Sequence, residues 1–419
     1  MKLAMESVKH QKTNWSIIDK IAFRVIFSYV ILFILLLFTA LLFEGFLRWF
    51  ADIFLGWGSD FSTESTGSGD RSFDYVRFAL NLVLALLVGL IWTIADRKRH
   101  SYNTLFYWFQ VILRVALFVA MLFYGLAKVF NGQFGSPSLE LLMQSVGEMS
   151  PMGLAWTFMG YSLAYSIFIG FIEILGGVLL LYRKTQTIGS LIIVGVMTNV
   201  VVMNLIYDIP VKLFSMHLTL MAIILLWPDR YRIINMFFKN KTVEKIEFYK
   251  PLANGALKKV IRGGRGFVVV LLTLILIVQC FVQFELREQL KSKSEFYGIW
   301  ESQLFIKNKD TIPPLLTDTY RWRYLIVDLK KKAAIKKMND SIDRYQFKFD
   351  TVQKKIVFNR EADLIPQHFF YNLNDDTTLE LKGVLDGDSL QVYFKRKPES
   401  DFRLINRKFH WVNESTYNY

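Results

Sequence analysis

The stretch "GVMTNVVVMNLIYDIPVKLFSMHLTLMAIILL" (residues 195–226) sets the architecture of this chain, because two long apolar runs flank one short polar turn. Pro210 lies at the centre of the turn, where it ends one helix and starts the next. The polar residues around it are Asp208, Lys212, Ser215 and His217. The stretch therefore predicts a hairpin of two membrane helices with ionisable groups at its tip.

Similar apolar runs recur along the first two thirds of the chain. Hydrophobic residues make up 53% of the 419 residues and charged residues only 21%, and the mean hydropathy is positive. A helix of about 20 apolar residues crosses a bilayer core. Seven spans are predicted, at 21–46, 73–96, 106–130, 155–182, 186–208, 211–227 and 264–284. The first is too long for a signal peptide, and no small-residue cleavage site follows it, so we expect it to be retained.

Lysine and arginine alternate between the predicted connections, which indicates the orientation of the spans. The N-terminus, the second connection "DRKRH" (96–100), the fourth "YRKTQ" (182–186) and the sixth (229–266) are basic. The first connection is acidic and rich in glycine and serine, and the third (131–154) has no lysine or arginine. We expect a cytoplasmic N-terminus and an external C-terminal region. The net charge of +14 then reflects cytoplasmic loops beside anionic lipid, and no nucleic-acid partner is expected.

After about residue 285 the pattern changes to the alternation of half-buried strands. It is clearest in "YQFKFD" (345–350), "TTLELKG" (377–383) and "SLQVYFKRK" (389–397). A small antiparallel β-barrel or a strongly curved sheet is predicted. Gly298 and Trp300 on the first strand, with a late arginine to cover the tryptophan, resemble the lipocalin-type barrel. Such a barrel could hold a ligand or have a filled, structural interior.

The predicted organisation has five parts. They are an N-terminal tail with two spans (1–105), a four-helix bundle (106–228), a basic cytoplasmic loop (229–266), a seventh span (267–290) and an external β domain (291–419).

Cysteine and histidine usage excludes several redox sites. Cys280, in the seventh span, is the one cysteine, so the chain lacks the cysteine pair of a dithiol relay. Among five histidines, only His217 lies in a predicted span, which argues against a haem held between two imidazoles. No metal site, Walker loop or Gly-x-Ser-x-Gly motif is expected.

Two opposite charges lie at similar predicted depths in the inner half of the bundle. Arg114 is about eight residues above the cytoplasmic face on the third span, and Glu173 about nine on the fourth. We expect Arg114 and Glu173 to form a structural ion pair, because an uncompensated charge is costly there. The alternative is a functional charge site.

Polar side chains gather in the outer half of four consecutive spans. They are Tyr124, Lys128, Tyr161, Tyr165, Asn204, Asp208, Lys212 and His217. One interpretation is that these residues snorkel and cap helix ends, as tyrosine and lysine often do. The other is that they line a ligand pocket open to the outer side, with Asp208 and Lys212 paired across the turn. Histidine suits proton transfer in such a pocket, since its ordinary pKa is near neutrality.

The segments "LRVALFVAMLFYGLAKVF", "FIEILGGVLLLYRKT" and the hairpin quoted above resemble the DoxX-like family of bacterial membrane proteins. The likeness covers residues 106–228, and its most specific pieces are Tyr-Gly-x-x-Lys at 124–128 and Glu-x-x-Gly-Gly at 173–177. The resemblance implies a bacterial inner membrane and quinone-linked redox chemistry, so a quinone is a possible cofactor. The missing cysteine pair argues against thiol chemistry by this chain.

Two functional hypotheses follow from these patterns. In the first, the external-facing pocket binds a quinone or a similar lipid-soluble molecule in a redox-linked assembly, with Tyr165, His217 and Asp208 as its hydrogen-bonding groups. In the second, the chain is a non-catalytic subunit of an envelope complex and docks other proteins through its β domain. The sequence assigns no catalytic residue under either hypothesis.

Overall fold

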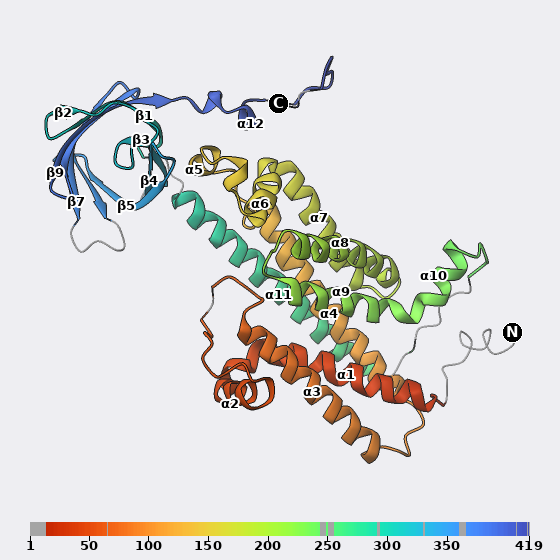
Figure 1. The fold of residues 1–419 in the computed structure, drawn as a ribbon. Coiled ribbons are helices and arrows are strands. Elements are labelled where there is room, and N and C mark those ends of the chain that lie inside the picture. The colour runs from red at the N-terminus through yellow and green to blue at the C-terminus, as the bar shows by residue number, and fades with distance from the viewer. Residues whose placement is uncertain are drawn as a thin grey trace. The chain divides into compact units, whose positions relative to one another are not determined.

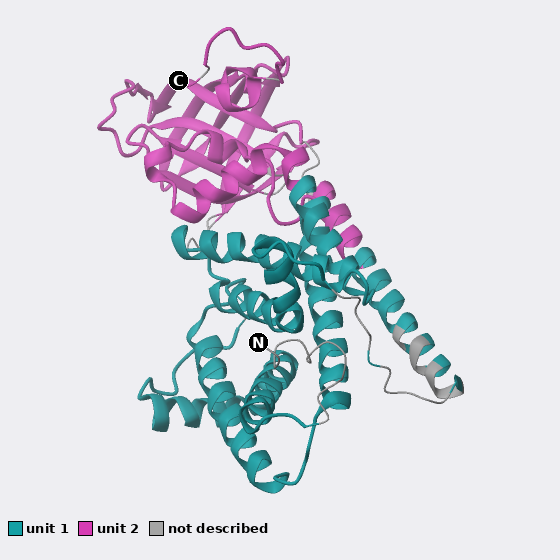
Figure 2. Ribbon diagram, turned by 90° about the vertical axis from the view of Figure 1, so that its right-hand side faces the viewer, with its two compact units in different colours: residues 1–129, 167–278 teal, residues 130–166, 279–419 magenta. Residues whose placement is uncertain are grey.

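The computed structural model describes residues 14–64, 66–243, 249, 255–290, 294–329, 332–359, 366–407, 409–416 and 418. The chain forms two compact units (Figure 2). Residues 1–129 and 167–278 make the membrane unit, and residues 130–166 and 279–419 make the barrel unit. Each unit is described by itself.

Among the described residues, seven helices are long and apolar enough to cross a membrane, which is the number of spans that the sequence predicts. They cover Ile17–Leu55, Ser72–Ala95, Asn103–Val129, Leu163–Leu180, Gln186–Ile206, Lys212–Phe237 and Gly266–Gln289. The protein is therefore a multi-pass helical membrane protein with an added β domain.

The first candidate span changes helix type along its length. It comprises α1 (Ile17–Thr39), a 3-10 turn η1 (Ala40–Phe43), α2 (Glu44–Phe50) and a π turn η2 (Ala51–Leu55). The other helices of the membrane unit are α3 (Ser72–Ala95), α4 (Asn103–Val129), α8 (Gln186–Ile206), α9 (Lys212–Leu226), η4 (Trp227–Asp229) and α10 (Arg230–Phe237). Helices α7 (Leu163–Leu180) and α11 (Gly255–Leu290), labelled in Figure 1, have residues in both units.

The fourth predicted span, 155–182, is wrong in its outer part. Ser150 and Pro151 begin a separate helix, α6 (Pro151–Tyr161), because the Ser150 hydroxyl accepts the Gly153 amide. Ser162 is extended, and its hydroxyl accepts the Tyr165 amide at 3.3 Å, so it ends one helix and caps α7. The predicted basic loop 229–266 is also partly helical, in α10 and the start of α11; its residues 244–248 and 250–254 lie outside the described residues.

Two helix pairs form much of the membrane unit. Helix α1 packs on α3, where a Cβ at Gly89 would lie 2.7 Å from Val25 Cγ2, and α8 packs on α9. One core of buried apolar side chains draws on α1, α4, α8 and α9. The helix that carries His217 is therefore held against both the early and the late spans.

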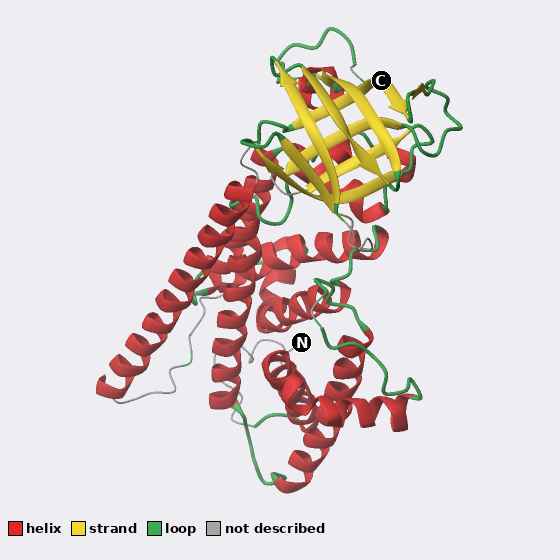
Figure 3. Ribbon diagram, turned by 90° about the vertical axis from the view of Figure 1, so that its left-hand side faces the viewer, coloured by secondary structure: helices red, strands yellow, loops and turns green. Residues whose placement is uncertain are grey.

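In the described part of the β domain, nine antiparallel strands form one sheet, drawn in yellow in Figure 3. They are β1 (Gly298–Lys307), β2 (Asp310–Thr311), β3 (Trp322–Leu329), β4 (Lys332–Lys337), β5 (Ile342–Asp350), β6 (Lys355–Asn359), β7 (Gln367–Asn374), β8 (Thr378–Leu385) and β9 (Asp388–Lys397). Strand β2 only extends the edge of β1, and the others follow one another until β9 pairs back onto β1. The predicted antiparallel barrel is confirmed.

The interior of the barrel is packed with apolar and aromatic side chains. Trp300 is fully buried, and its indole donates to the Phe296 carbonyl at 2.9 Å. The Arg396 guanidinium lies 5.5 Å from the Trp300 ring centroid. Gly298 has φ +145°, and a Cβ there would lie 2.9 Å from Arg396 Nε. Arg396 is thus the late arginine that the Gly-x-Trp pattern predicts, and the packing favours a structural interior.

The connection between the third and fourth spans packs on the outside of this barrel. A short helix, α5 (Leu139–Leu142), contributes Leu139 to an apolar cluster with Ile299 and Ile326. Lys336 Nζ donates to the Met143 carbonyl at 3.0 Å. This connection and the β domain therefore pack together within the barrel unit. Three short elements complete the described elements: η3 (Val146–Glu148) before α6, and η5 (Glu399–Asp401) and α12 (Arg403–Asn406) after β9.

Candidate functional site

The polar residues of the predicted pocket lie in several separate places. Tyr124 and Lys128 face α7, Asn204, Asp208 and Lys212 hold the hairpin, and His217 faces α1 and α3. Tyr161 and Tyr165 belong to the barrel unit and are 48% and 42% exposed. The structure therefore divides the predicted set, and each part has its own neighbours.

Lys128 and Glu173 form a buried ion pair between α4 and α7. The Lys128 ammonium lies 2.9 and 2.8 Å from the two carboxylate oxygens of Glu173, and 5.6 Å from the Tyr124 ring centroid. Both charged side chains are at most 5% exposed. The motif residues at 124–128 and 173–177 thus meet each other.

The predicted partnership of Arg114 with Glu173 is wrong. Arg114 lies fourteen residues before Lys128, about 21 Å along the helix axis, and its Nη1 donates to Gln186 Oε1 at 3.4 Å. The position of α4 along α7 is set by close packing at two glycines. A Cβ at Gly125 would lie only 2.6 Å from the Gly170 carbonyl oxygen, so the helices can approach this closely only where glycine faces glycine. Helix α4 therefore extends well past the inner end of α7, whereas the prediction assumed that the two helices end at one depth.

The hairpin residues mainly stabilise the turn. Asp208 pairs with Lys212 at 2.7 Å, which confirms the predicted contact across the turn, but the Asp208 side chain is 84% exposed. Buried Asn204 donates to the Ser215 hydroxyl at 3.0 Å and to the Val211 carbonyl at 3.3 Å. These bonds satisfy the polar groups where α8 ends and α9 begins.

His217 is buried in an aromatic cage made with α1 and α3. Its Nε2 lies 2.6 Å from the Tyr29 hydroxyl, and its Nδ1 lies 2.6 Å from the Leu213 carbonyl oxygen. The imidazole stacks on Phe33 with ring centroids 4.0 Å apart, and Phe78 meets it edge-on at 5.8 Å. Both ring nitrogens are therefore used within the protein, and His217 offers a ligand its ring face.

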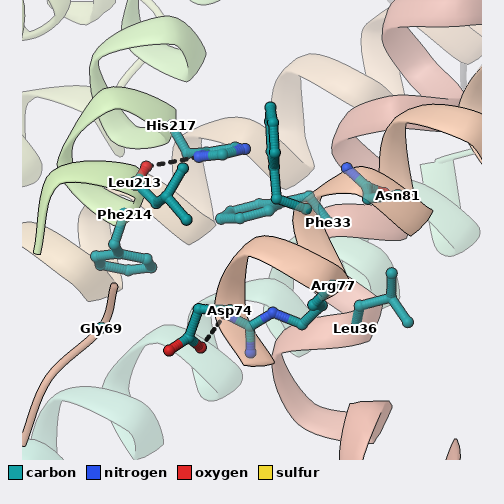
Figure 4. A pocket seen from close by; sticks show the side chains of 10 residues that line it. Phe33, Leu36, Gly69, Asp74, Arg77, Asn81, Leu213, Phe214 and His217 are labelled. Atoms are coloured by element: carbon teal, nitrogen blue, oxygen red, sulfur yellow. Dashed lines mark hydrogen bonds and ion pairs between the residues drawn. The ribbon is translucent and has the colours of Figure 1, made fainter. Parts of the chain in front are cut away.

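A small pocket lies beside this imidazole (Figure 4). Its lining residues are Phe33, Leu36, Gly69, Asp74, Arg77, Phe78, Asn81, Leu213, Phe214 and His217. The cavity volume is about 20 Å³, which is room for about one water molecule. Aromatic rings and a few polar groups thus line this small cavity together.

The polar groups of the pocket come from α3. Asp74 accepts from Arg71 at 3.0 Å and from Arg77 at 3.1 Å. The Asn81 amide nitrogen donates to the Tyr29 carbonyl at 3.3 Å, and Asn81 is 1% exposed. Among the residues that the structure describes, no donor lies within hydrogen-bond distance of Asn81 Oδ1. That oxygen is a buried acceptor of Asn81, one of the residues that line the pocket.

The sequence hypothesis missed this contribution of the first two spans. Asp74, Arg77 and Asn81 are three and four residues apart, so they share one helical face. That spacing within an apolar run was the available signal. Tyr29 carried no comparable pattern, because a single tyrosine in a span is common.

The first connection lies over the start of α9. Both carboxylate oxygens of Asp70 accept backbone amides, those of Lys212 at 2.7 Å and Leu213 at 2.9 Å. The Gly69 amide donates to the Pro210 carbonyl at 2.7 Å. Asp70 thereby caps a helix that is distant in sequence and fixes Gly69 in the pocket wall.

A second polar cluster joins the opposite ends of α1 and α3 to the start of α4. Buried Arg24 donates to the Tyr102 hydroxyl and to the Asp96 carbonyl, each at 2.8 Å. The Tyr102 hydroxyl donates to Asp96 Oδ2 at 2.8 Å, which lowers the pKa of Asp96, while burial raises the pKa of Tyr102. The polar groups of this cluster hydrogen-bond to one another, so the cluster is structural.

Comparison with known proteins gives one relative. Over 129 residues the chain is 43% identical to "Uncharacterized protein YwoB" of Bacillus subtilis (strain 168), a match that covers 31% of this chain and 79% of the relative. The chain belongs to the YwoB family. No family model and no solved structure matches the chain. The printed name of YwoB states no activity, so a proposal for function depends on the site.

Proposed function

We propose that the membrane unit binds a quinone or a similar lipid-soluble ring in the pocket beside His217. The observation that carries the proposal is Asn81 Oδ1, a buried acceptor without a donor among the described residues. A buried polar atom without a partner costs about 1–3 kcal/mol. A bound molecule that donates to this oxygen would recover that free energy.

The aromatic lining supports a planar ligand. Phe33, Phe78 and Phe214 come from three different helices and surround the polar wall. Flat rings pack well against such side chains in offset or edge-on contacts. The polar groups would then orient the ring, while the phenylalanines would supply most of the buried apolar area.

Entry of a ring requires the pocket to open, since its volume is about 20 Å³. Phe214 is the side chain best placed to move. Its ring centroid lies 6.5 Å from that of Phe33 and 6.2 Å from that of Tyr124, in tilted contacts. Rotation of Phe214 would widen the pocket without breaking a hydrogen bond, because a phenylalanine side chain makes none.

The proposed setting is a bacterial inner membrane with the N-terminus in the cytoplasm and the β domain outside. The loop charges and the DoxX-like resemblance of residues 106–228 support this setting and a redox-linked assembly. Reporter fusions at residues 98 and 184 should be cytoplasmic, and fusions at 140 and the C-terminus external. A cytoplasmic C-terminus would overturn the orientation.

The binding proposal is tested with purified protein in lipid nanodiscs and a short-tailed naphthoquinone as the probe. Asn81→Leu keeps the branched shape of the side chain but removes its acceptor and its donor, and it should weaken binding about tenfold. Asn199→Leu is the matched control, because Asn199 is exposed on α8. Equal affinity of the two variants for either redox form of the probe would contradict the proposal.

A second candidate function is that of a non-catalytic subunit that docks envelope proteins through the β domain. The aromatic packing inside the barrel favours it, because a filled barrel acts through its surface. Stoichiometric co-purification of another membrane protein should then be lost on removal of residues 291–419 and kept in Asn81→Leu. Retained co-purification after that truncation would overturn this candidate.

A further inference from the structure

We propose that helix α10 (Arg230–Phe237) is an interfacial anchor that binds anionic phospholipid headgroups where α9 leaves the membrane. Three features of residues 227–241 lead to this inference, and none of them involves the pocket beside His217. They are the point at which α9 ends, an exposed apolar face on α10, and the basic residues beside that face.

Helix α10 begins where α9 has already crossed most of a bilayer core. The 15 residues of α9 (Lys212–Leu226) and the 3 residues of η4 (Trp227–Asp229) measure about 27 Å at helical rise, and a bilayer core is about 30 Å thick. In Figure 1, α10 continues from that end of α9 and projects past the other labelled helices of the membrane unit. We therefore expect α10 to lie at the membrane surface rather than in the hydrocarbon core.

The side chains of this segment divide into two faces. At about 100° per residue, aromatic and aliphatic side chains share one face. They are Tyr231, Ile234, Phe237 and Phe238, and these residues are 37% to 81% exposed. Arg232 lies on the opposite face and pairs with Asp229 at 3.3 Å, and Asp229 accepts the Thr187 hydroxyl of α8. The polar face is thus held toward the protein, and the apolar face is left exposed.

Basic residues accompany the apolar face. Residues 227–241 contain four of them and a single acidic residue, Asp229; the basic residues are Arg230, Arg232, Lys239 and Lys241. The Arg230 guanidinium lies 4.6 Å from the Trp227 ring centroid and 4.3 Å from that of Tyr231. The Lys241 amide donates to a carbonyl within α10, that of Asn235, at 2.8 Å, which keeps Lys241 at the end of the helix.

This arrangement favours an anionic bilayer surface as the occupant of the exposed face. Helices that lie in the interface typically combine an aromatic and aliphatic face with arginine and lysine beside it. Each basic residue near an anionic surface strengthens binding about fivefold. Four basic residues against one acidic residue give the segment a net charge of +3, which is complementary to phosphatidylglycerol and similar headgroups.

The test measures how fast a water-soluble maleimide modifies single cysteines in the full-length protein in nanodiscs. Cys280 is the one cysteine of the chain, so every variant also carries Cys280→Ser. Ile234→Cys places a thiol on the apolar face, and Thr242→Cys places one on an exposed residue after the helix as the reference. Adding about 30% phosphatidylglycerol to phosphatidylcholine should slow the modification of Ile234→Cys, relative to Thr242→Cys, by at least about tenfold.

Two pairs of charge substitutions, each added to Ile234→Cys, show whether the basic residues cause this protection. Lys239→Gln with Lys241→Gln should reduce the effect of phosphatidylglycerol to less than about threefold. Lys348→Gln with Lys395→Gln is the matched control, because it removes the same charge from exposed residues of barrel strands and should keep the full effect.

Two results would overturn the anchor. Modification of Ile234→Cys at the reference rate in both lipid mixtures would show that the apolar face lies in water. Slow modification that does not change with lipid composition would show that a protein, either a second copy of this chain or a partner, covers the face instead of anionic lipid.

Discussion

The two cores of this protein are built in opposite ways. The barrel interior is aromatic and aliphatic, and Arg396 lies over Trp300 where the Gly-x-Trp segment begins. The membrane unit buries Lys128, Glu173 and His217 among its apolar side chains. Volume and shape therefore stabilise the barrel, whereas correct pairing of polar groups stabilises the membrane unit. Buried polar groups inside a membrane protein usually mark function, so the ligand site is expected in the membrane unit.

The largest effect is expected from breaking the buried ion pair. Lys128→Leu leaves the Glu173 carboxylate without its partner and should reduce the free energy of unfolding by about 3–5 kcal/mol. The double variant Lys128→Leu with Glu173→Leu should recover most of that loss, because both charges of the pair are then removed. Unfolding in mixed detergent micelles measures the difference.

Two controls sharpen this prediction. Arg114→Leu combined with Glu173→Leu should show no recovery, because Lys128 then loses its partner. Asp208→Asn breaks an exposed pair on the hairpin and should cost less than about 1 kcal/mol. If the double variant with Arg114→Leu recovered the free energy of unfolding and the double variant with Lys128→Leu did not, Arg114 would be the partner of Glu173, as expected from the sequence.

In the barrel, the variant that tests the core removes part of a buried apolar side chain. Leu325 is fully buried in the core cluster, so Leu325→Ala should cost about 2–4 kcal/mol through lost contacts and a cavity. Leu316→Ala is the matched control, because Leu316 is 68% exposed. Near-ultraviolet circular dichroism of the full chain follows the barrel aromatics. Equal effects of the two variants would contradict the filled interior.

A smaller effect is expected where the first connection caps α9. Asp70→Ala removes the acceptor for the Lys212 and Leu213 amides and should cost about 1 kcal/mol. Hydrogen exchange at those two amides should accelerate, whereas Asp60→Ala, in an exposed part of the same connection, should leave it unchanged. Unaltered exchange in Asp70→Ala would show that the cap is not needed.

The smallest effect concerns the alkaline stability of the barrel. Burial and the nearby Glu399 carboxylate raise the pKa of Tyr297 to about 12, against about 10 in the unfolded chain. The uncharged phenol therefore contributes stability that is complete below pH 10 and is lost as the pH rises through 12. Tyr297→Phe should flatten the loss of stability between those values in alkaline unfolding. If stability fell with pH equally steeply in Tyr297→Phe and in the wild-type protein, the Tyr297 phenol would not contribute to the alkaline stability.

The sequence predicted the elements of both units but not how the spans meet. Apolar length marks a span and period-two alternation marks a strand, so the seven helices and the barrel followed from local patterns. The Asp208–Lys212 contact was also local, across a single turn. Glu173 was assigned the wrong partner because axial register depends on the close approach at Gly125 and Gly170, which a depth estimate ignores.

The candidate site was only partly predictable for the same reason. His217 lies in a candidate span, as the sequence predicts, but its neighbours were expected from the later helices. Tyr29 and Asn81 instead reach it from α1 and α3, and the pairing of distant helices leaves no mark in residue spacing. The ligand-binding role of the predicted residues remains a prediction.

The central claim, that the pocket between α1, α3 and α9 binds the ligand, is tested most directly by photolabelling. An azido-naphthoquinone is reacted with the protein in nanodiscs under light, and the labelled peptides are mapped by mass spectrometry. Labels should fall within 72–95 and 212–226, and excess unlabelled naphthoquinone should suppress them. Suppressible labelling confined to residues 298–397 of the barrel, or no suppressible labelling at all, would contradict the claim.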